Sequence, residues 1–143
     1  MPPVVVTVVK LSKVMEPLEE IRDFVNAGPE GALREAIRVL LRANNGIDEG
    51  VAGASRVLDE AARRARLRVG FGGGALTFES EERVLAAVAE AMADGSWARL
   101  KACRADDCKW AFIDTARNRT RIWCDMAVCG NREKARRYRS RHA

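Results

Sequence analysis

Hydrophobic residues recur with a helical period through most of the first 96 positions. A β-branched run at residues 4–9 precedes weakly periodic apolar residues at 18–25, which predicts a strand and a short helix within residues 1–28. Two stronger amphipathic helices follow, one from Pro29 to Asn44 and one from Val51 to Ala65. A further helix begins after Ser80, which we expect to cap it, carries Met92 on its inner face and ends at Gly95.

A period of two replaces the helical period between residues 67 and 78. Leu67, Val69 and Phe71 alternate with Arg68 and Gly70, and the alternation resumes after three glycines at residues 72–74. This pattern predicts a β-hairpin. The glycines lack both the G-x-G-x-x-G spacing and a following Lys-Ser/Thr, so we interpret them as a turn and exclude a phosphate-binding loop.

Four cysteines lie near the C-terminus as two pairs, with the spacing Cys103-x4-Cys108-x15-Cys124-x4-Cys129. Zn²⁺ takes four thiolates in a tetrahedron, and closely spaced pairs let a tight turn direct two sulfurs at one ion. Two disulfides are the rival interpretation and an iron–sulfur cluster is a third, but a reducing cytoplasm disfavours disulfides. We predict one structural Zn²⁺, because four thiolates leave no position open for catalysis.

All three tryptophans lie in or beside this cysteine segment. Trp97 precedes it, Trp110 shares a predicted strand face with Phe112, and Trp123 comes directly before the third cysteine. A segment this small and charged needs apolar contacts close to the metal, so the rings are expected to form a minimal core. Stacking of nucleic-acid bases on these rings is the alternative.

Charge is distributed unevenly along the chain. Residues 97–143 hold 13 Lys and Arg against 5 Asp and Glu, whereas residues 1–96 carry a net charge of −3, and the total is +5. Clustered cations favour a polyanionic partner because phosphates release counterions on binding, although a solvated tail that aids solubility is the alternative. No apolar run approaches the roughly 20 residues of a membrane span and no signal peptide is evident, so we expect a cytoplasmic protein without membrane contact.

The cysteine segment resembles the CGNR zinc finger over roughly residues 98–143. The matching residues are Phe112, Asp114, Arg117, Asn118, Arg121, Trp123, Cys124, Met126, Cys129, Gly130, Asn131 and Arg132. The helices and hairpin before it look like the later part of the ABATE domain, which commonly precedes such fingers in bacteria. The resemblance implies zinc binding and a DNA-binding role in stress-induced transcription regulators. Two departures are the region before Pro29, which is shorter than a usual ABATE start, and Thr115, where Ser is expected.

Residues 131–141 contain good helix formers and neither Pro nor Gly. A helix here places Arg132, Arg136 and Arg139 along one face, which suits a phosphate backbone or a major groove. The predicted nucleic-acid surface comprises Arg117, Arg119, Arg121, Arg132, Lys134, Arg136, Arg137 and Arg139. Four residues are predicted to support the metal site structurally: Asp114, by accepting from a motif arginine, together with Asn131, Trp110 and Trp123.

The predicted fold class is α+β. A mostly helical, ABATE-like body with a β-hairpin occupies residues 1–96, and a four-cysteine zinc module that ends in a basic helix occupies residues 97–143. The leading hypothesis is a DNA-binding transcription regulator without enzymatic activity, whose body senses a signal, forms a homodimer or binds a protein. A zinc-stabilised protein-interaction adaptor is the runner-up, and RNA stays open as a ligand.

Overall fold

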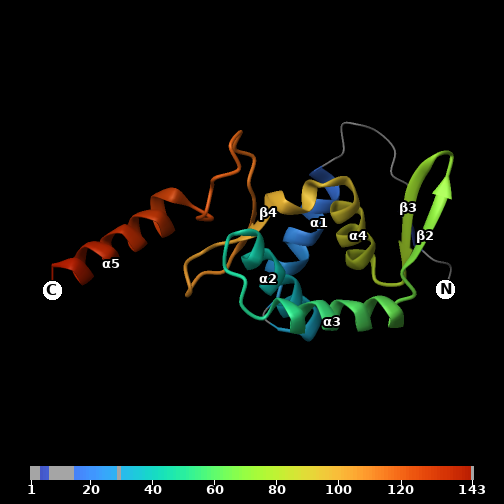
Figure 1. Cartoon of the computed structure of the whole chain (residues 1–143), viewed down its shortest axis with the longest axis horizontal. Helices are drawn as coiled ribbons and strands as arrows, with labels where there is room; N and C mark the ends of the chain where they lie inside the picture. The colour runs from blue at the N-terminus through green and yellow to red at the C-terminus, as the bar shows by residue number, and fades with distance from the viewer. Residues whose placement is uncertain (1–3, 7–14, 29, 143) are drawn as a thin grey trace.

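The computed structural model describes residues 4–6, 15–28 and 30–142. Within these residues the chain is a mixed α+β fold with five α-helices and two β-hairpins, which confirms the predicted fold class (Figure 1). The elements are β1 (Val4–Val6), α1 (Met15–Asn26), α2 (Ala32–Asn44), α3 (Val51–Arg64), β2 (Arg68–Gly72), β3 (Ala75–Ser80), α4 (Arg83–Asp94), η1 (Ser96–Arg99), β4 (Leu100–Ala102), β5 (Ala111–Ile113), η2 (Met126–Gly130) and α5 (Asn131–Arg141). None of the described helices is long and apolar enough to cross a membrane.

The main hydrophobic core lies between α1, α2, α3 and α4. Leu18 and Ile21 of α1 and Ile37 and Leu41 of α2 are fully buried, at the helical spacing that the sequence pattern predicts. Helix α3 contributes Leu58, and α4 contributes a continuous run of buried residues from Val84 to Val88. Apolar side chains on the four helices therefore meet in one cluster, which forms the core of the body.

A three-stranded antiparallel sheet with the order β1-β3-β2 lies at one end of the body. The predicted hairpin is β2–β3, and its turn consists of Gly73 and Gly74, whose φ angles of 60° and 83° suit glycine. The strand expected at residues 4–9 is β1, which pairs with the end of β3. Residues 7–9 of that expectation lie outside the described residues.

Two expectations about α4 are wrong. Ser80 does not cap the helix, because β3 continues through Ser80 to pair with Val4 and α4 begins only at Arg83. The Ser80 hydroxyl instead donates to the carbonyl of Ala65 at 3.1 Å and accepts from the backbone N–H of Glu82 at 3.2 Å. Met92 was expected on the inner face of the helix, but it lies in the last turn of α4 and is 47% exposed.

The second hairpin, β4–β5, joins the C-terminal segment to the body. Leu100 and Ala102 of β4 and Ala111 and Ile113 of β5 are buried in the same core as the body helices. The hairpin therefore encloses the first cysteine pair in its loop. Helix α5 contains no buried residue and projects from the rest of the molecule as the red helix in Figure 1.

Candidate metal centre

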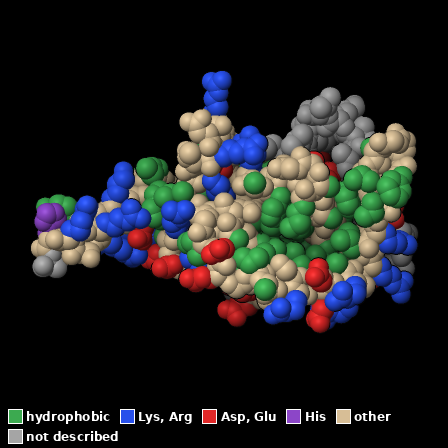
Figure 2. All heavy atoms as spheres, in the orientation of Figure 1, with side chains coloured by type: hydrophobic (Ala, Val, Ile, Leu, Met, Phe, Trp, Pro, Cys, Tyr) green, Lys and Arg blue, Asp and Glu red, His purple; other side chains and the backbone are tan. Residues whose placement is uncertain are grey.

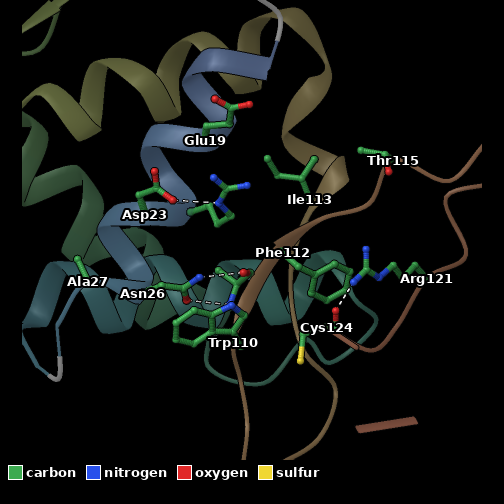
Figure 3. A pocket seen from close by; sticks show the side chains of 12 residues that line it. Glu19, Asp23, Asn26, Ala27, Trp110, Phe112, Ile113, Thr115, Arg121 and Cys124 are labelled. Atoms are coloured by element: carbon green, nitrogen blue, oxygen red, sulfur yellow. Dashed lines mark hydrogen bonds and ion pairs between the residues drawn. The ribbon is translucent and has the colours of Figure 1, made fainter. Parts of the chain in front are cut away.

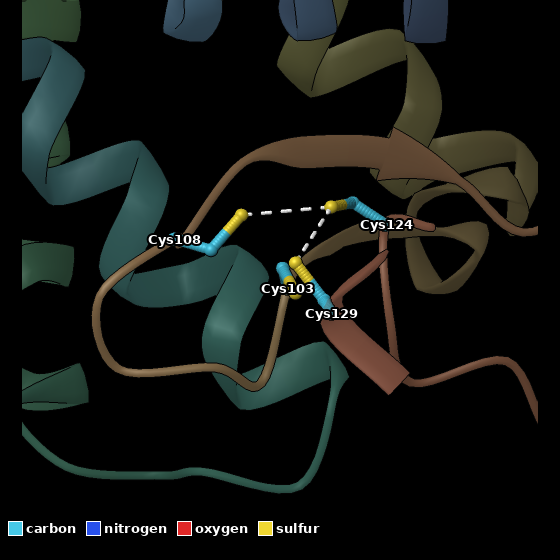
Figure 4. A group of neighbouring side chains, drawn as sticks. All are labelled: Cys103, Cys108, Cys124 and Cys129. Atoms are coloured by element: carbon cyan, nitrogen blue, oxygen red, sulfur yellow. Dashed lines mark hydrogen bonds between the residues drawn. The ribbon is translucent and has the colours of Figure 1, made fainter. Parts of the chain in front are cut away.

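Four cysteine side chains converge between the β4–β5 loop and η2 (Figure 4). The sulfurs of Cys103, Cys108, Cys124 and Cys129 lie within 4.8 Å of one another. The Sγ atom of Cys124 is 3.5 Å from that of Cys108 and 3.6 Å from that of Cys129. A tetrahedron with Zn–S bonds of about 2.3 Å has edges of about 3.8 Å, so the cluster fits one zinc ion. All four thiols are free, so the structure supports a metal site over two disulfides.

The first two ligands lie on a tight turn that follows β4. Cys103 is fully buried, and its backbone N–H donates to the carbonyl of Trp110 at 2.8 Å, which closes the hairpin loop. The N–H of Cys108 donates to the carbonyl of Ala105 at 3.0 Å. Lys109 completes the turn with a φ of 54°, an uncommon angle for a side-chain-bearing residue. The turn thereby directs both sulfurs toward the same point.

The second two ligands flank a turn that Asp125 caps. Its carboxylate accepts from the backbone N–H groups of Ala127 at 2.8 Å and of Val128 at 3.2 Å. The backbone carbonyl of Asp125 also accepts from the N–H of Cys129 at 2.9 Å, which brings that ligand to the start of α5. Sequence analysis missed Asp125, although an Asp at the first position of a turn is a recognisable capping signal.

Gly130 follows the last ligand because a side chain there would collide with its neighbours. A Cβ atom at this position would lie 2.7 Å from Sδ of Met126 and 3.0 Å from Cδ1 of Trp123. Trp123 is 7% exposed and belongs to the small apolar cluster around the cysteines. Gly130 therefore allows η2 to pack closely against the ring that covers the metal centre.

Burial and hydrogen bonding separate the pKa values of the cysteines. Burial raises the pKa of the Cys129 thiol to about 11, and it also raises the pKa of Cys124. Burial opposes ionisation of Cys103 too, but hydrogen bonds from the backbone N–H groups of Cys124 and Ala105 outweigh it and lower that pKa. A bound Zn²⁺ stabilises all four thiolates, so metal binding to this cluster releases protons.

Asp107 connects the first cysteine turn to α5. Its two carboxylate oxygens accept from Arg132 at 3.1 Å and from Arg136 at 3.0 Å. The hydrogen bond from Arg136 and the positive charges of both arginines lower the pKa of Asp107. The same Nη2 atom of Arg132 lies 3.5 Å from the sulfur of Cys129, where its positive charge favours the thiolate. Arg132 and Arg136, predicted to lie on the nucleic-acid surface, are thus placed in contacts that hold α5 to the metal centre.

The exposed side chain of Arg121 lies over Phe112, which belongs to the small apolar cluster around the cysteines. Its guanidinium lies 4.7 Å from the ring centroid of Phe112 and donates to the carbonyl of Trp123 at 2.9 Å and to the carbonyl of Cys124. Asn131 donates to the carbonyl of Ala127 at 3.1 Å, within the turn that carries the last ligand. Both residues therefore contact the backbone that positions the cysteines.

A buried ion pair fixes the loop between the cysteine pairs. Nζ of Lys101 donates to Asp114 at 2.8 Å and to the carbonyls of Arg119 and Arg121 at 2.8 and 2.9 Å. Asp114 is fully buried and also accepts from the backbone N–H groups of Ala116 and Arg121. Asp114 was expected to accept from a motif arginine side chain. Among the described residues its side-chain partner is Lys101, which sequence analysis missed.

Three asparagines of the body bind the backbone of the C-terminal segment. Asn45 donates to the carbonyls of Ala102 at 2.9 Å and Ile122 at 2.8 Å, and Asn44 donates to those of Trp97 and Leu100. Asn26 of α1 makes a two-way pair with the backbone of Ala111, with bonds of 2.9 and 3.0 Å (Figure 3). A pocket of about 560 Å³ lies beside this joint, between α1 and β5. Polar and apolar contacts together therefore join body and metal centre.

Replacement of Asn45 by alanine tests this joint. Asn45 is 3% exposed, and its loss leaves the carbonyls of Ala102 and Ile122 without their donor. We expect Asn45→Ala to lower the free energy of unfolding by about 2 to 4 kcal/mol, measured by urea denaturation. Asn118→Ala, which removes an exposed asparagine, serves as the control and should change it by less than about 0.5 kcal/mol. Equal effects of the two substitutions would contradict the role given to Asn45.

The other predicted surface residues lie in two exposed regions. Arg117 and Arg119 are on the loop between the cysteine pairs, which forms the orange projection in Figure 1, and Lys134, Arg137 and Arg139 are on α5. The tryptophans differ from one another: Trp123 is buried and Trp97 packs against the main core, whereas Trp110 is 52% exposed. Trp110 therefore lies outside the minimal core in which it was expected.

Two cysteine-bearing turns around one point, the second leading into a helix, define a zinc-finger type of site. A family model described as CGNR zinc finger matches residues 99–142. These residues therefore form a CGNR zinc finger domain, and its four cysteines hold one structural Zn²⁺. Comparison with curated proteins gives no match for the chain.

Proposed function

We propose that this protein binds duplex DNA through α5 and acts as a transcription regulator. The observation that carries the proposal is the charge and exposure of α5. This 11-residue helix has six Lys and Arg, one Glu and no buried residue. A protruding basic helix suits the width of the major groove and the charge of the phosphates that border it. The ABATE-like arrangement expected for residues 1–96 supports the regulatory part of the proposal.

The two faces of α5 differ in how their cations are used. Arg132 and Arg136 lie on one face and are paired with acidic groups, Asp107 and Glu133. Lys134, Arg137 and Arg141 lie on the other face at the spacing i, i+3 and i+7, and no ion-pair partner for them occurs among residues 15–28 and 30–142. Unpaired cations are free to bind phosphates without first breaking an ion pair. We infer that the Lys134–Arg137–Arg141 face contacts DNA.

This assignment moves the contact face away from the stripe suggested by sequence spacing. That stripe was Arg132, Arg136 and Arg139, of which only Arg139 has no ion-pair partner in the described part of the chain. The new face adds Arg141, which the sequence analysis had not selected. Tyr138, 60% exposed, lies next to it on the helix and offers a ring and a hydroxyl to the same ligand.

Fluorescence anisotropy on duplex DNA at several salt concentrations tests the proposal. The triple variant Lys134→Gln, Arg137→Gln, Arg141→Gln should bind more weakly, and the slope of log K against log salt should fall by about 2.7, since each lost phosphate contact removes about 0.9. A matched control removes three exposed arginines of α3, by Arg56→Gln, Arg63→Gln and Arg64→Gln. This control has the same change of net charge and should keep the slope of the parent protein.

The outcomes separate the candidate functions. Equal loss of affinity in both triple variants would mean that net charge and not the α5 face governs binding. Absence of binding to duplex DNA at low salt would contradict the proposal and favour the zinc-stabilised adaptor, in which the same helix meets an acidic protein surface. Single-stranded RNA of equal length, used as a competitor, decides between the two nucleic acids.

A further inference from the structure

The β2–β3 hairpin has an apolar face that is largely uncovered. Val69 and Phe71 on β2 lie opposite Phe78 and Leu76 on β3, so all four side chains share one face. Phe78 is buried, but Phe71 is 83% exposed, Val69 53% and Leu76 46%. Figure 2 shows the hydrophobic side chains gathered over this end of the molecule, opposite α5. Exposed apolar surface of this kind marks an interaction site.

The described part of the chain also leaves the outer edge of β2 without a paired strand. In the sheet order β1-β3-β2, no described strand pairs with β2 on its far side. The positive φ angles of Gly73 and Gly74 are those of a type I′ turn, so the pair that flanks the turn, Gly72 and Ala75, exchanges hydrogen bonds. Hydrogen-bonded and non-hydrogen-bonded residue pairs alternate along an antiparallel ladder. The backbone N–H and C=O groups of Val69 and Phe71 therefore point away from β3, toward the free edge.

The sequence of β2 is complementary to itself about Gly70. An antiparallel approach of a second copy with Gly70 facing Gly70 places each Val69 opposite a Phe71, a β-branched and aromatic pair of the kind that stabilises sheets. In this register Val69 and Phe71, whose backbone N–H and C=O groups point to the free edge, hydrogen-bond to each other across the two copies. Each Arg68 faces a Gly72, so no like charges oppose one another. The strand also lacks the Lys and Pro residues that protect exposed edges from pairing.

We propose that the chain forms a two-fold symmetric homodimer in which the two β2 strands pair and the two sheets become one sheet of six strands. The partner is a second copy because one register satisfies the backbone groups, the apolar pairs and the charges at the same time. Helix α5 lies at the far end of the molecule from this edge (Figure 1), so the dimer leaves the metal centre and the proposed DNA surface uncovered.

Sedimentation velocity of the zinc-loaded chain over a range of concentrations tests the dimer. The wild-type protein should approach twice its mass of 15.8 kDa as concentration rises. The variant Val69→Lys, Phe71→Lys places lysines beside one another across the interface and should raise the dimer dissociation constant about tenfold or more. Met92→Lys, at another exposed apolar position, should dimerise like the wild type. Bound zinc and circular dichroism of each variant verify that it is folded.

Hydrogen exchange provides a second measurement that locates the interface. The backbone N–H groups of Val69 and Phe71 should exchange rapidly in dilute protein and slowly at concentrations where the dimer forms, because pairing satisfies them. A wild-type protein that stays monomeric at high concentration overturns the proposal. A dimer that survives the double lysine substitution, or that forms without protection of Val69 and Phe71, overturns the proposed surface. None of these measurements involves DNA.

Discussion

Replacement of Cys129 by serine is expected to remove the bound zinc and to unfold the C-terminal segment. Cys129 is 4% exposed, and its sulfur is one of four that lie within 4.8 Å of one another. A structural zinc site contributes on the order of 10 kcal/mol of apparent folding free energy, and three thiolates hold the ion much less tightly. The small cluster around Phe112 and Trp123 is too small to replace that contribution.

The effect of Cys129→Ser should extend into the body. Leu100, Ala102, Ala111 and Ile113 belong to the main core, so loss of order in β4 and β5 uncovers α1 and α2. We expect one unfolding transition at a lowered temperature and the loss of hydrogen-exchange protection in both strands. Val128→Ser, in the same turn but 58% exposed, is the control and should retain one zinc ion per chain. Retention of full zinc stoichiometry by Cys129→Ser would exclude Cys129 as a ligand.

Replacement of Lys101 by methionine is expected to lower the free energy of unfolding by about 3 to 5 kcal/mol, the range found when one partner of a buried ion pair is removed. Methionine keeps most of the side-chain volume but leaves the Asp114 carboxylate, which is fully buried, without its cation. The carbonyls of Arg119 and Arg121 lose their donor as well. Urea denaturation near neutral pH measures the change. Lys109→Met, which alters the charge equally and lies in the loop of the same hairpin, should have little effect.

The destabilisation by Lys101→Met should become smaller as pH falls. In the wild type, burial opposes ionisation of Asp114, but the hydrogen bond and positive charge of Lys101, together with the backbone N–H groups of Ala116 and Arg121, outweigh it and lower the pKa of Asp114. Ionised Asp114 therefore stabilises the wild type above its ordinary pKa, and this contribution is lost as pH falls through the lowered value. Without Lys101 the buried carboxyl takes up a proton instead, so the two stability curves approach one another in acid. Lys101→Met/Asp114→Asn should likewise recover part of the loss.

The sequence predicts most of the fold because apolar periodicity is a local signal. The helical spacing of Ile37 and Leu41 and the alternation of Val69 and Phe71 each depend on residues only a few positions apart. The metal ligands are equally predictable, since two closely spaced cysteine pairs are a recognised zinc-binding pattern. The end of β3 was misjudged because Ser80 carries a capping signal, whereas its pairing with Val4 depends on a distant segment.

The polar contacts that position the metal centre were not predictable in the same way. Lys101 pairs with Asp114 across a hairpin, Asp107 pairs with two arginines of α5, and Asn45 reaches a backbone carbonyl 57 residues away. No periodic pattern marks such residues, because each one resembles an ordinary surface polar residue until the fold brings its partner near. For the same reason, the sequence did not indicate that Arg132 and Arg136 of the predicted DNA stripe are paired with Asp107.

The attachment of α5 at η2 also determines how precisely the helix is oriented relative to the rest of the molecule. Its 11 residues rise about 16 Å, so a tilt of about 10° at η2 displaces the last turn by about 3 Å. Successive base pairs are separated by about 3.4 Å, so this small rotation would shift the helix tip by nearly one base pair. The two ion pairs of Asp107 resist such a rotation. If the proposed function holds, Asp107 determines which base pairs the tip of α5 reaches, although Asp107 does not itself contact the DNA.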